Sequence, residues 1–392
     1  MLDRDNQRAT VALGSIASIK SGGTPDRKNP DYWQVGAIPW ATTSEVNYSV
    51  ITRTKEQISE EGLRNSSAKI FPKGTLLIAL YGQGKTRGQV GILGVDAATN
   101  QACAAIMPSN EFDAQFLFYV MQNDYSRIRR LSNSGGQDNL SAELVKEIRI
   151  PVASLVEQRK ISAILRTWDE ALEKLTALRA AKERRLTGLR DRLLFGTLRA
   201  IKQRSNWPSR RISEVTYEIT DRNGSMSLGR DLVMGVTNKR GIVPMREQTV
   251  AGDIARYKNL PPRAFAYNPM RINVGSIAMN EASETVLVSP DYVVFGCNPD
   301  GIEPDYLDHL RKTPWWAHYI NSGGSGSVRQ RTYYADLAAL RLPLPDIDEQ
   351  REIVAILNAA KADLSSTEQM IEAVTLQKRG LMQKLLTGEW RV

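Results

Sequence analysis

The residue types that carry most enzyme chemistry are scarce in this chain. Its 392 residues include two histidines, His309 and His318, and two cysteines, Cys103 and Cys297. A hydrolase of the Ser-His-Asp or Cys-His kind needs a histidine beside its nucleophile, and a zinc site needs clustered cysteines and histidines. Both histidines stand close to two tryptophans in a segment of helical character, which favours a packing role. The sequence therefore predicts neither a catalytic triad nor a metal site.

A glycine-rich segment, residues 81–86, follows a β-like run and superficially looks like a phosphate-binding loop. That loop requires a glycine five residues before Gly84, and the position is Ala79. We interpret the segment as a hairpin tip with an exposed Lys85 and a nearby Arg87. Such a tip can press on a phosphate backbone or on a base edge.

Other short fragments also fall short of an active site. Residues 26–28 offer an acid-x-Lys fragment seen in nucleases, which is too short to be specific. Residues 268–271 and 298–300 lack the second proline and the aromatic residue of an adenine methyltransferase motif. No glycine-rich nucleotide fingerprint follows a strand. The chain looks like a non-catalytic binding subunit whose catalytic partners are other chains.

The elements that must position these residues are organised by an internal repeat. Residues 149–199 return as residues 341–391 at a constant offset of 192, without a gap. Glu157-Gln158-Arg159 returns as Glu349-Gln350-Arg351, and each follows an Ile-Pro or Leu-Pro pair. A repeat at a constant offset indicates that the chain contains two copies of one structural unit.

Both copies of the repeat predict a long helix with a coiled-coil seam. In copy one the 4-3 spacing runs through Ile161, Leu165, Trp168, Leu172, Leu175, Arg179, Lys182, Leu186, Leu189 and Leu193. In copy two it runs through Ile353, Leu357, Ala360, Leu364, Thr367, Ile371, Val374, Lys378, Leu381 and Leu385. A sustained 3.5-residue period is typical of a coiled coil, and two separate amphipathic helices on globular cores are the alternative.

Two larger blocks separate the helices and read as compact mixed α/β domains with much loop. The expected strands are residues 75–81, 89–93, 264–267, 275–279 and 285–288. The expected helices are residues 116–121 and 306–310, and a glycine loop follows each, at 134–136 and 322–324. The division is 1–148, 149–204, 205–340 and 341–392. The two blocks share this layout, but their residues barely align.

The net charge of +9 is concentrated in one segment. Residues 157–204 carry 13 basic and 6 acidic side chains. These basic side chains fit a solvated helix face, or a face that follows DNA phosphates or meets an acidic partner. Arg179 and Lys182 occupy seam positions, and the alternative is that they mark where the coil opens for a partner.

In combination these features resemble the specificity subunit (HsdS) of a type I restriction-modification system. The resemblance rests on the repeated Pro, Glu-Gln-Arg and long-helix unit at 150–165 and 342–357. It also rests on the loop 135–141, on Ser21-Gly22-Gly23-Thr24-Pro25 and on Asn100-Gln101. The second block departs from the pattern, because its loop 323–330 lacks the Asn-Leu-Ser found at residues 139–141.

The resemblance implies an α+β fold with two mixed α/β target recognition domains. Two long helices separate them as an antiparallel coiled coil, and the internal repeat is pseudo-twofold. Each domain is expected to read one half of a bipartite, asymmetric target in double-stranded DNA. The helices are expected to dock two methyltransferase (HsdM) subunits, and motor-nuclease (HsdR) subunits join them. S-adenosylmethionine, ATP and Mg are expected on those partner subunits, and this chain is expected to hold no cofactor.

The candidate DNA contacts are loop side chains that can donate or accept hydrogen bonds at base edges. Arg and Lys pair with guanine, and Asn and Gln with adenine, in the major groove. In the first domain they are Lys28, Gln83, Lys85, Thr86, Arg87, Gln137 and Asn139. In the second domain they are Lys239, Arg240, Arg271, Asn273, Arg329 and Gln330. Each of them also fits an ordinary solvated surface residue.

Two other functions remain open from the sequence. One is the specificity module of a different type of restriction or phage-defence methyltransferase. The other is a coiled-coil scaffold that binds protein but no DNA, although two large unlike domains argue against it. The first residues contain no apolar signal core, and no apolar run is long enough to cross a bilayer, so we expect a cytoplasmic protein without a membrane segment.

Overall fold

The computed structural model describes residues 8–34, 36–82, 84–131, 139–199, 207–224, 227–238, 240–322 and 331–392. The chain divides into two compact units. Unit 1 consists of Met1–Thr176 with Met370–Val392, and unit 2 of Ala177–Gln369. The long helices α6 (Leu155–Leu193) and α11 (Ile347–Thr387) each contribute residues to both units.

Unit 1 contains three antiparallel or mixed sheets, with strand orders β1-β11, β2-β10-β7-β8-β4 and β5-β3-β9-β6. The strands are β1 (Thr10–Ala12), β2 (Ile19–Ser21), β3 (Ile38–Ala41), β4 (Val50–Ile51), β5 (Glu56–Ile58), β6 (Ile70–Phe71), β7 (Leu76–Ala79), β8 (Val90–Leu93), β9 (Ala97–Thr99), β10 (Cys103–Ile106) and β11 (Arg149–Pro151). The helices are α1 (Leu13–Ile16), η2 (Pro30–Tyr32), α2 (Glu60–Arg64), α3 (Ala114–Asn123), α4 (Tyr125–Leu131) and α5 (Ala142–Lys146).

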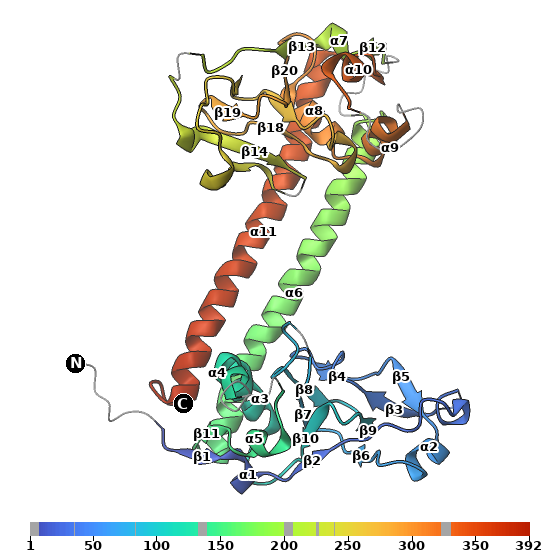
Figure 1. The fold of residues 1–392 in the computed structure, drawn as a ribbon, viewed down its shortest axis with the longest axis vertical. Helices are drawn as coiled ribbons and strands as arrows, with labels where there is room; N and C mark the ends of the chain where they lie inside the picture. The colour runs from blue at the N-terminus through green and yellow to red at the C-terminus, as the bar shows by residue number, and fades with distance from the viewer. Residues whose placement is uncertain are drawn as a thin grey trace, which may run out of the picture. The chain divides into compact units, whose positions relative to one another are not determined.

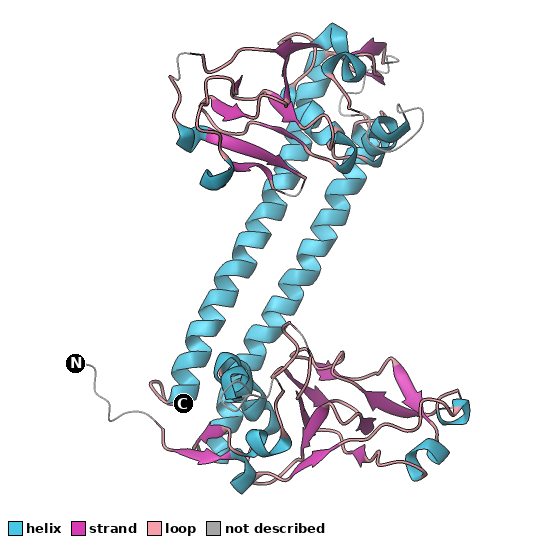
Figure 2. Cartoon of the chain, in the orientation of Figure 1, coloured by secondary structure: helices cyan, strands magenta, loops and turns pink. Residues whose placement is uncertain are grey.

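The core of unit 1 joins the larger sheet to the long helices through α3. Leu76 and Ile78 on β7 share one buried cluster with Phe116 on α3, Ile161 on α6 and Leu385 on α11. Figure 1 shows α3 between the strands and the long helices, and Figure 2 shows the strands beyond it. Asp113 begins α3, because its carboxylate accepts a hydrogen bond from the Phe116 backbone N–H at 2.8 Å.

Unit 2 also contains three sheets, with strand orders β12-β21, β13-β20-β17-β18 and β15-β14-β19-β16. The strands are β12 (Ser209–Arg211), β13 (Thr216–Ile219), β14 (Val233–Thr237), β15 (Gly241–Pro244), β16 (Lys258–Leu260), β17 (Phe265–Tyr267), β18 (Ile277–Met279), β19 (Val286–Val288), β20 (Val293–Cys297) and β21 (Arg341–Pro343). The helices are α7 (Ile212–Val215), η3 (Arg230–Leu232), η4 (Glu247–Thr249), η5 (Ile272–Val274), α8 (Pro304–Leu310), α9 (Pro314–Ser322) and α10 (Tyr334–Ala338).

The strand pairing of unit 2 follows that of unit 1. In unit 1, β10 lies between β2 and β7, and in unit 2 β20 lies between β13 and β17. One four-stranded sheet in each unit, β5-β3-β9-β6 and β15-β14-β19-β16, contains a parallel pair at its centre, β3 with β9 and β14 with β19. The strands and helices expected from the sequence are confirmed in both units. The two blocks therefore share most of their strand pairing, with β4 as an additional strand in unit 1, although their residues barely align.

The 4-3 positions of the repeat, Arg179 excepted, are buried or half-buried, as the spacing predicted. Ile161 and Leu165 are fully buried in unit 1, and Ile353 and Leu357 are fully buried in unit 2. Within each unit the helices run antiparallel, because residue numbers rise along one helix as they fall along the other. Arg391 and Lys378 contact Glu157 and Asp169 in unit 1. Arg199 and Lys182 contact Glu349 and Asp363 in unit 2.

The glutamine of each Glu-Gln-Arg motif binds the backbone at the start of another helix, α3 in unit 1 and α8 in unit 2. The side-chain oxygen of Gln158 accepts the backbone N–H of Asp113 at 2.8 Å, just before α3. The oxygen of Gln350 accepts the backbone N–H of Glu303 at 2.9 Å, just before α8. Both amide nitrogens then donate to a backbone carbonyl five residues upstream of the glutamine. A buried amide that satisfies its own hydrogen-bond groups in this way explains why the motif repeats.

The glutamate of each motif binds an arginine that is distant in sequence, Arg8 in unit 1 and Arg199 in unit 2. Arg8 donates two hydrogen bonds to Glu157, at 2.8 and 2.6 Å, and this guanidinium lowers the pKa of that carboxyl below its usual value. In unit 2, Glu349 is 3% exposed. It accepts hydrogen bonds from Arg199 at 2.8 and 2.9 Å and from the Trp207 indole N–H at 3.0 Å.

A second polar contact joins the domain helix of unit 1 to the long helices. The Tyr119 hydroxyl on α3 donates to the Asp169 carboxylate on α6 at 2.6 Å. Lys378 on α11 pairs with the same carboxylate and lies 5.3 Å from the centre of the Tyr119 ring. One residue from each of three helices thus meets at this contact.

Unit 2 makes the same kind of contact with different residues. His309 on α8 accepts a hydrogen bond from Arg190 on α6 at its Nδ1 atom, at 3.2 Å. Its Nε2 atom must then carry the proton and donate to the Asn358 side-chain oxygen, 2.9 Å away. Burial, together with the Arg190 charge, lowers the pKa of His309 to about 4. The expectation that this histidine has a packing role is confirmed.

Candidate nucleic-acid interface

The β7–β8 connection of unit 1 is a tight loop with an exposed tip. Gly84 and Gly88 have φ angles of 73° and 84°, in the left-handed region where residues with a Cβ are strained. The Gly88 N–H bonds the Ala79 carbonyl at 2.9 Å and closes the loop. Lys85 is exposed, and Thr86 and Arg87 are half-buried. Gln83 lies outside the described residues.

Helix α4 lies under this loop and binds its backbone. The Tyr125 hydroxyl donates to the Lys85 carbonyl at 2.5 Å, and an Arg129 Nη1 donates to the Gly84 carbonyl at 2.6 Å. The same guanidinium nitrogen donates to the Tyr125 hydroxyl at 2.8 Å. Sequence reasoning missed both residues, because a tyrosine and an arginine on a short polar helix look like ordinary surface residues.

Asn139 is the other candidate of unit 1 that the structure brings to this loop. It is exposed, and the backbone N–H of the next residue, Leu140, bonds the Leu80 carbonyl at the root of the loop, at 3.0 Å. Lys85, Thr86, Arg87 and Asn139 therefore belong to one part of the surface. Gln137 lies outside the described residues.

Lys28 belongs to a different loop of unit 1. It is exposed, and its backbone N–H bonds the Asp26 carboxylate at 2.9 Å. Its neighbour Arg27 pairs with Glu56 on β5 at 2.5 Å and stacks 3.8 Å from the centre of the Trp33 ring. Within the described ranges, no hydrogen bond or ion pair joins residues 26–33 to the β7–β8 loop.

The candidates of unit 2 gather around the β14–β15 turn and the loop between β17 and β18. The Asn238 side-chain amide in the turn donates to the Val274 carbonyl in the loop at 2.5 Å. Gly275, with a φ of 84°, allows this close approach. Arg240 in the turn and Arg271 and Asn273 in the loop are exposed. Lys239, Arg329 and Gln330 lie outside the described residues.

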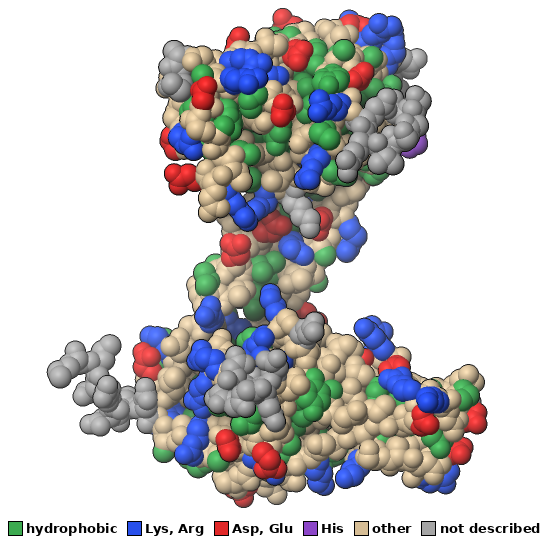
Figure 3. All heavy atoms as spheres, viewed as in Figure 1, with side chains coloured by type: hydrophobic (Ala, Val, Ile, Leu, Met, Phe, Trp, Pro, Cys, Tyr) green, Lys and Arg blue, Asp and Glu red, His purple; other side chains and the backbone are tan. Residues whose placement is uncertain are grey.

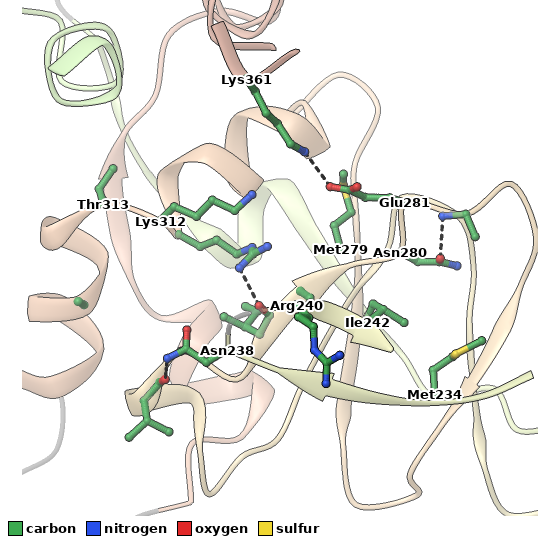
Figure 4. Close-up of a pocket in the computed structure, with 18 of the residues that line it drawn as sticks. Met234, Asn238, Arg240, Ile242, Met279, Asn280, Glu281, Lys312, Thr313 and Lys361 are labelled. Atoms are coloured by element: carbon green, nitrogen blue, oxygen red, sulfur yellow. Dashed lines mark hydrogen bonds and ion pairs between the residues drawn. The ribbon is translucent and has the colours of Figure 1, made fainter. Parts of the chain in front are cut away.

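An open pocket of about 1050 Å³ lies beside this turn in unit 2. Its apolar floor includes Met234, Ile242 and Met279, and its polar lining includes Arg240, Asn238, Glu281, Lys312 and Lys361 (Figure 4). The pocket opens between the β14–β15 hairpin, the turn before α9 and helix α11. Its lining mixes cationic donors, amides and apolar surface, which are the groups that read base edges.

Charge pairing inside the pocket leaves Arg240 as its available cation. Lys312 pairs with Asp308 at 2.5 Å, and Lys361 pairs with Glu281 at 2.9 Å. Burial opposes the charge of Asp308, but Arg311 and Lys312 outweigh it and keep its pKa below the usual value. Among the residues that the structure describes, none forms an ion pair with Arg240, so its guanidinium is available to a ligand.

The basic segment of α6 divides into internal and exposed side chains. Lys182 binds Asp363 at 2.6 Å and Thr367 at 2.9 Å, so the idea that it marks an opening of the coil is wrong for this residue. A cation at a seam position is accommodated here because the facing seam position is also polar. Arg179 and two further arginines, Arg184 and Arg185, are exposed. Figure 3 shows Lys and Arg side chains interspersed with Asp and Glu on the face drawn.

Both cysteines and the second histidine lie on separate elements, β10, β20 and α9. Burial raises the pKa of both thiols, Cys103 and Cys297, to about 12, which disfavours the nucleophilic thiolate. His318 is exposed on α9. Within the described part of the chain, no group of histidine, cysteine, aspartate and glutamate side chains could hold a metal ion. The same residues include no helix that is long and apolar enough to span a membrane.

Residues 7–182 match the type I restriction modification DNA specificity domain. The chain is 30% identical over 169 residues to the type I restriction enzyme MjaIX specificity subunit of Methanocaldococcus jannaschii, covering 41% of this chain and 38% of that subunit. It is 25% identical over 169 residues to the EcoR124I/EcoR124II specificity subunit of Escherichia coli, covering 42% of this chain and 41% of that subunit. The match thus spans about two fifths of each relative.

The whole fold is similar to a solved relative. The crystal structure of the type I restriction-modification system S subunit from M. genitalium matches with a TM-score of 0.61. The match covers 98% of both chains at 14% sequence identity, so it concerns the fold. At this identity the structural match shows the fold alone, and the likeness to a family rests on the sequence match. Over residues 7–182, the chain is therefore similar in sequence to the type I restriction modification DNA specificity domain.

Proposed function

We propose that this chain is the DNA-reading specificity subunit of a type I restriction-modification complex. Each unit contributes one target recognition domain, and each domain reads one half of a bipartite, asymmetric sequence in double-stranded DNA. The proposal rests on one observation. Two domains that share most of their strand pairing present loops at corresponding positions with different polar side chains, Lys85 and Arg87 in unit 1 and Arg271 and Asn273 in unit 2.

In this proposal the loops read bases through hydrogen bonds in the major groove. A well-placed arginine or lysine pairs with guanine, and one good bidentate contact contributes about 1–3 kcal/mol of discrimination against a wrong base. Because the side chains differ between the two loops, the two half-sites differ in sequence. The long helices set the separation of the half-sites, since residues of both helices belong to both units.

The long helices also dock protein partners in this proposal. Large apolar side chains on the helix surfaces remain exposed, which supports burial against another protein. They are Val156 (66% exposed), Leu178 (44%), Ile356 (40%), Met370 (54%) and Leu376 (68%). We propose that two HsdM methyltransferase subunits bind here and that HsdR motor-nuclease subunits join the complex. S-adenosylmethionine, ATP and Mg then belong to those partners, and this chain supplies recognition without catalysis.

The test is a methylation assay with the reconstituted complex of this chain and its methyltransferase subunits. Long-read sequencing of the methylated DNA gives the target as two half-sites. Replacing Lys85 and Arg87 by alanine should relax base preference in one half-site, and replacing Arg240 and Arg271 should relax it in the other. Arg64→Ala is the matched control, because this exposed arginine lies on α2 and not on either loop. If the complex methylates DNA without sequence preference, or binds no DNA, the proposal is wrong.

A further inference from the structure

We infer that Tyr125 and Arg129 are positioning residues that fix the β7–β8 loop and thereby set the base preference of the first recognition domain. This inference rests on the proposed function, because it assumes that the loop reads DNA. Neither residue has to touch a base. Their side chains bind the Lys85 and Gly84 carbonyls and so determine the direction of the loop side chains.

The loop backbone has few constraints of its own. Gly82, Gly84 and Gly88 all have positive φ angles, and glycine populates both signs of φ about equally. Inside the loop, the Gln89 N–H bonds the Thr86 carbonyl at 2.9 Å. The carbonyls of Gly84 and Lys85, at the tip, are bound by side chains of α4. The conformation of the tip therefore depends on α4.

Helix α4 is itself anchored in the core, so it can serve as a rigid support. The Tyr125 ring packs edge-on against Tyr48, with ring centres 6.1 Å apart. Tyr48 packs edge-on against Phe118 of α3, 6.4 Å away, and Phe118 is buried. A Cβ added at Gly88 would lie 3.4 Å from Arg129 Cγ, so the base of the loop runs close beside the same helix.

Bound carbonyls direct the other groups of the loop outward. Lys85 presents its ammonium group to solvent while its carbonyl is held from below. A side chain reads a base only when it is held near the productive geometry, and supporting hydrogen bonds provide that precision. Loss of one of these bonds should leave the fold of the domain intact and weaken the base preference of the loop.

Unit 2 supports its corresponding loop differently. There the Thr332 N–H bonds the Pro269 carbonyl at 3.1 Å, and Asn238 from the β14–β15 turn bonds the Val274 carbonyl. Tyr125 and Arg129 belong to unit 1, and that loop belongs to unit 2. A change at Tyr125 should therefore affect one half-site and leave the other as a built-in reference.

The test is Tyr125→Phe, which removes the hydroxyl and keeps the ring that packs on Tyr48. The full chain is assembled with its methyltransferase subunits, and methylation rates are measured on duplexes with single-base changes in either half-site. We expect the ratio of cognate to substituted rates to fall roughly fivefold for half-site 1, as befits one hydrogen bond, and to stay constant for half-site 2. Arg129→Met should act in the same direction.

Arg127→Met is the matched control, because Arg127 lies on the same helix and pairs with Asp124 at 3.5 Å instead of binding the loop. Thermal melting of each variant reports any general loss of stability. If Tyr125→Phe lowers the melting temperature or the rates on all duplexes equally, with discrimination unchanged, Tyr125 is only a structural residue and the inference is overturned.

One further variant separates this inference from the proposed function. If the double alanine variant of Lys85 and Arg87 changes base preference but Tyr125→Phe does not, the loop reads DNA without this support. If the double variant also leaves base preference unchanged, the loop is not a reader, and both the inference and the proposed role of the loop are wrong.

Discussion

Gln350→Met tests the idea that the repeated glutamine fastens each recognition domain to the long helices. Gln350 is fully buried and makes three hydrogen bonds, to the Glu303 N–H at 2.9 Å and to the Pro345 and Gly301 carbonyls at 3.0 and 3.2 Å. Methionine has a similar volume but cannot make these bonds. At about 1 kcal/mol each, their loss costs about 3 kcal/mol, mainly because buried partners remain unsatisfied.

Hydrogen exchange measured by mass spectrometry reports this loss of stability at the amide that loses its partner. Since 1.4 kcal/mol corresponds to a tenfold change in an equilibrium, exchange at the Glu303 amide should accelerate on the order of a hundredfold. The peptide covering residues 301–310 reports it. Gln158→Met should instead accelerate exchange at Asp113, whose N–H it binds in unit 1. The exposed Gln369 on α11 provides the control substitution Gln369→Met.

Two results would refute this reasoning. An acceleration below about threefold at Glu303 would mean that the amide bonds add nothing beyond packing. Equal acceleration at Glu303 by Gln350→Met and Gln158→Met would mean that each glutamine stabilises the whole chain and does not act on its own domain.

Three further predictions concern titratable or charged side chains on the long helices or in contact with them. Glu349→Leu removes the bonds from Arg199 and Trp207 and should cost about 2 kcal/mol, lowering the melting temperature by about 5 °C; a change below about 1 °C would contradict it. Because burial lowers the pKa of His309 to about 4, the unfolded chain binds a proton first as pH falls from about 6.5. The free energy of unfolding should therefore fall as the pH is lowered from about 6.5 to about 4. Denaturant titrations of His309→Gln should show a smaller change in this free energy over the same pH range. Replacing Arg179, Arg184 and Arg185 by glutamine should reduce the slope of log binding constant against log salt by about 0.9 for each DNA phosphate that these side chains neutralise, whereas an unchanged slope would exclude phosphate binding by this face.

The long helices were the most predictable part of the fold. Their 4-3 pattern recurs over the whole repeat, and such a pattern reports directly which positions are buried between helices. Ile161, Leu165, Ile353 and Leu357 are fully buried, as expected. The polar seam residues were harder to interpret, since the partner of Lys182 lies 181 positions away at Asp363 and no local pattern indicates it.

The candidate interface was predictable in composition but not in geometry. Glycine and lysine at residues 82–85 indicate an exposed tip, because glycine permits tight turns and lysine favours solvent. The support of that tip depends on Tyr125 and Arg129, which come from a helix about forty residues further along the chain. Lys28 lies on a different loop, which packs against β5 through Arg27 and Glu56, and its contact with DNA stays a prediction.

The division of the long helices between the two units has a consequence for synthesis of the protein. Unit 2 is one continuous stretch, whereas unit 1 needs Met370–Val392 to be complete. Leu385 and Leu386 of that last segment share a core with Ile161 and Leu165. At about 5–20 residues per second, the ribosome needs roughly 10–40 s to add the intervening residues. During that time the first domain to be made keeps an open apolar face, while the second can already close. We therefore expect unit 2 to complete its core before unit 1, although the chain of unit 1 is made first.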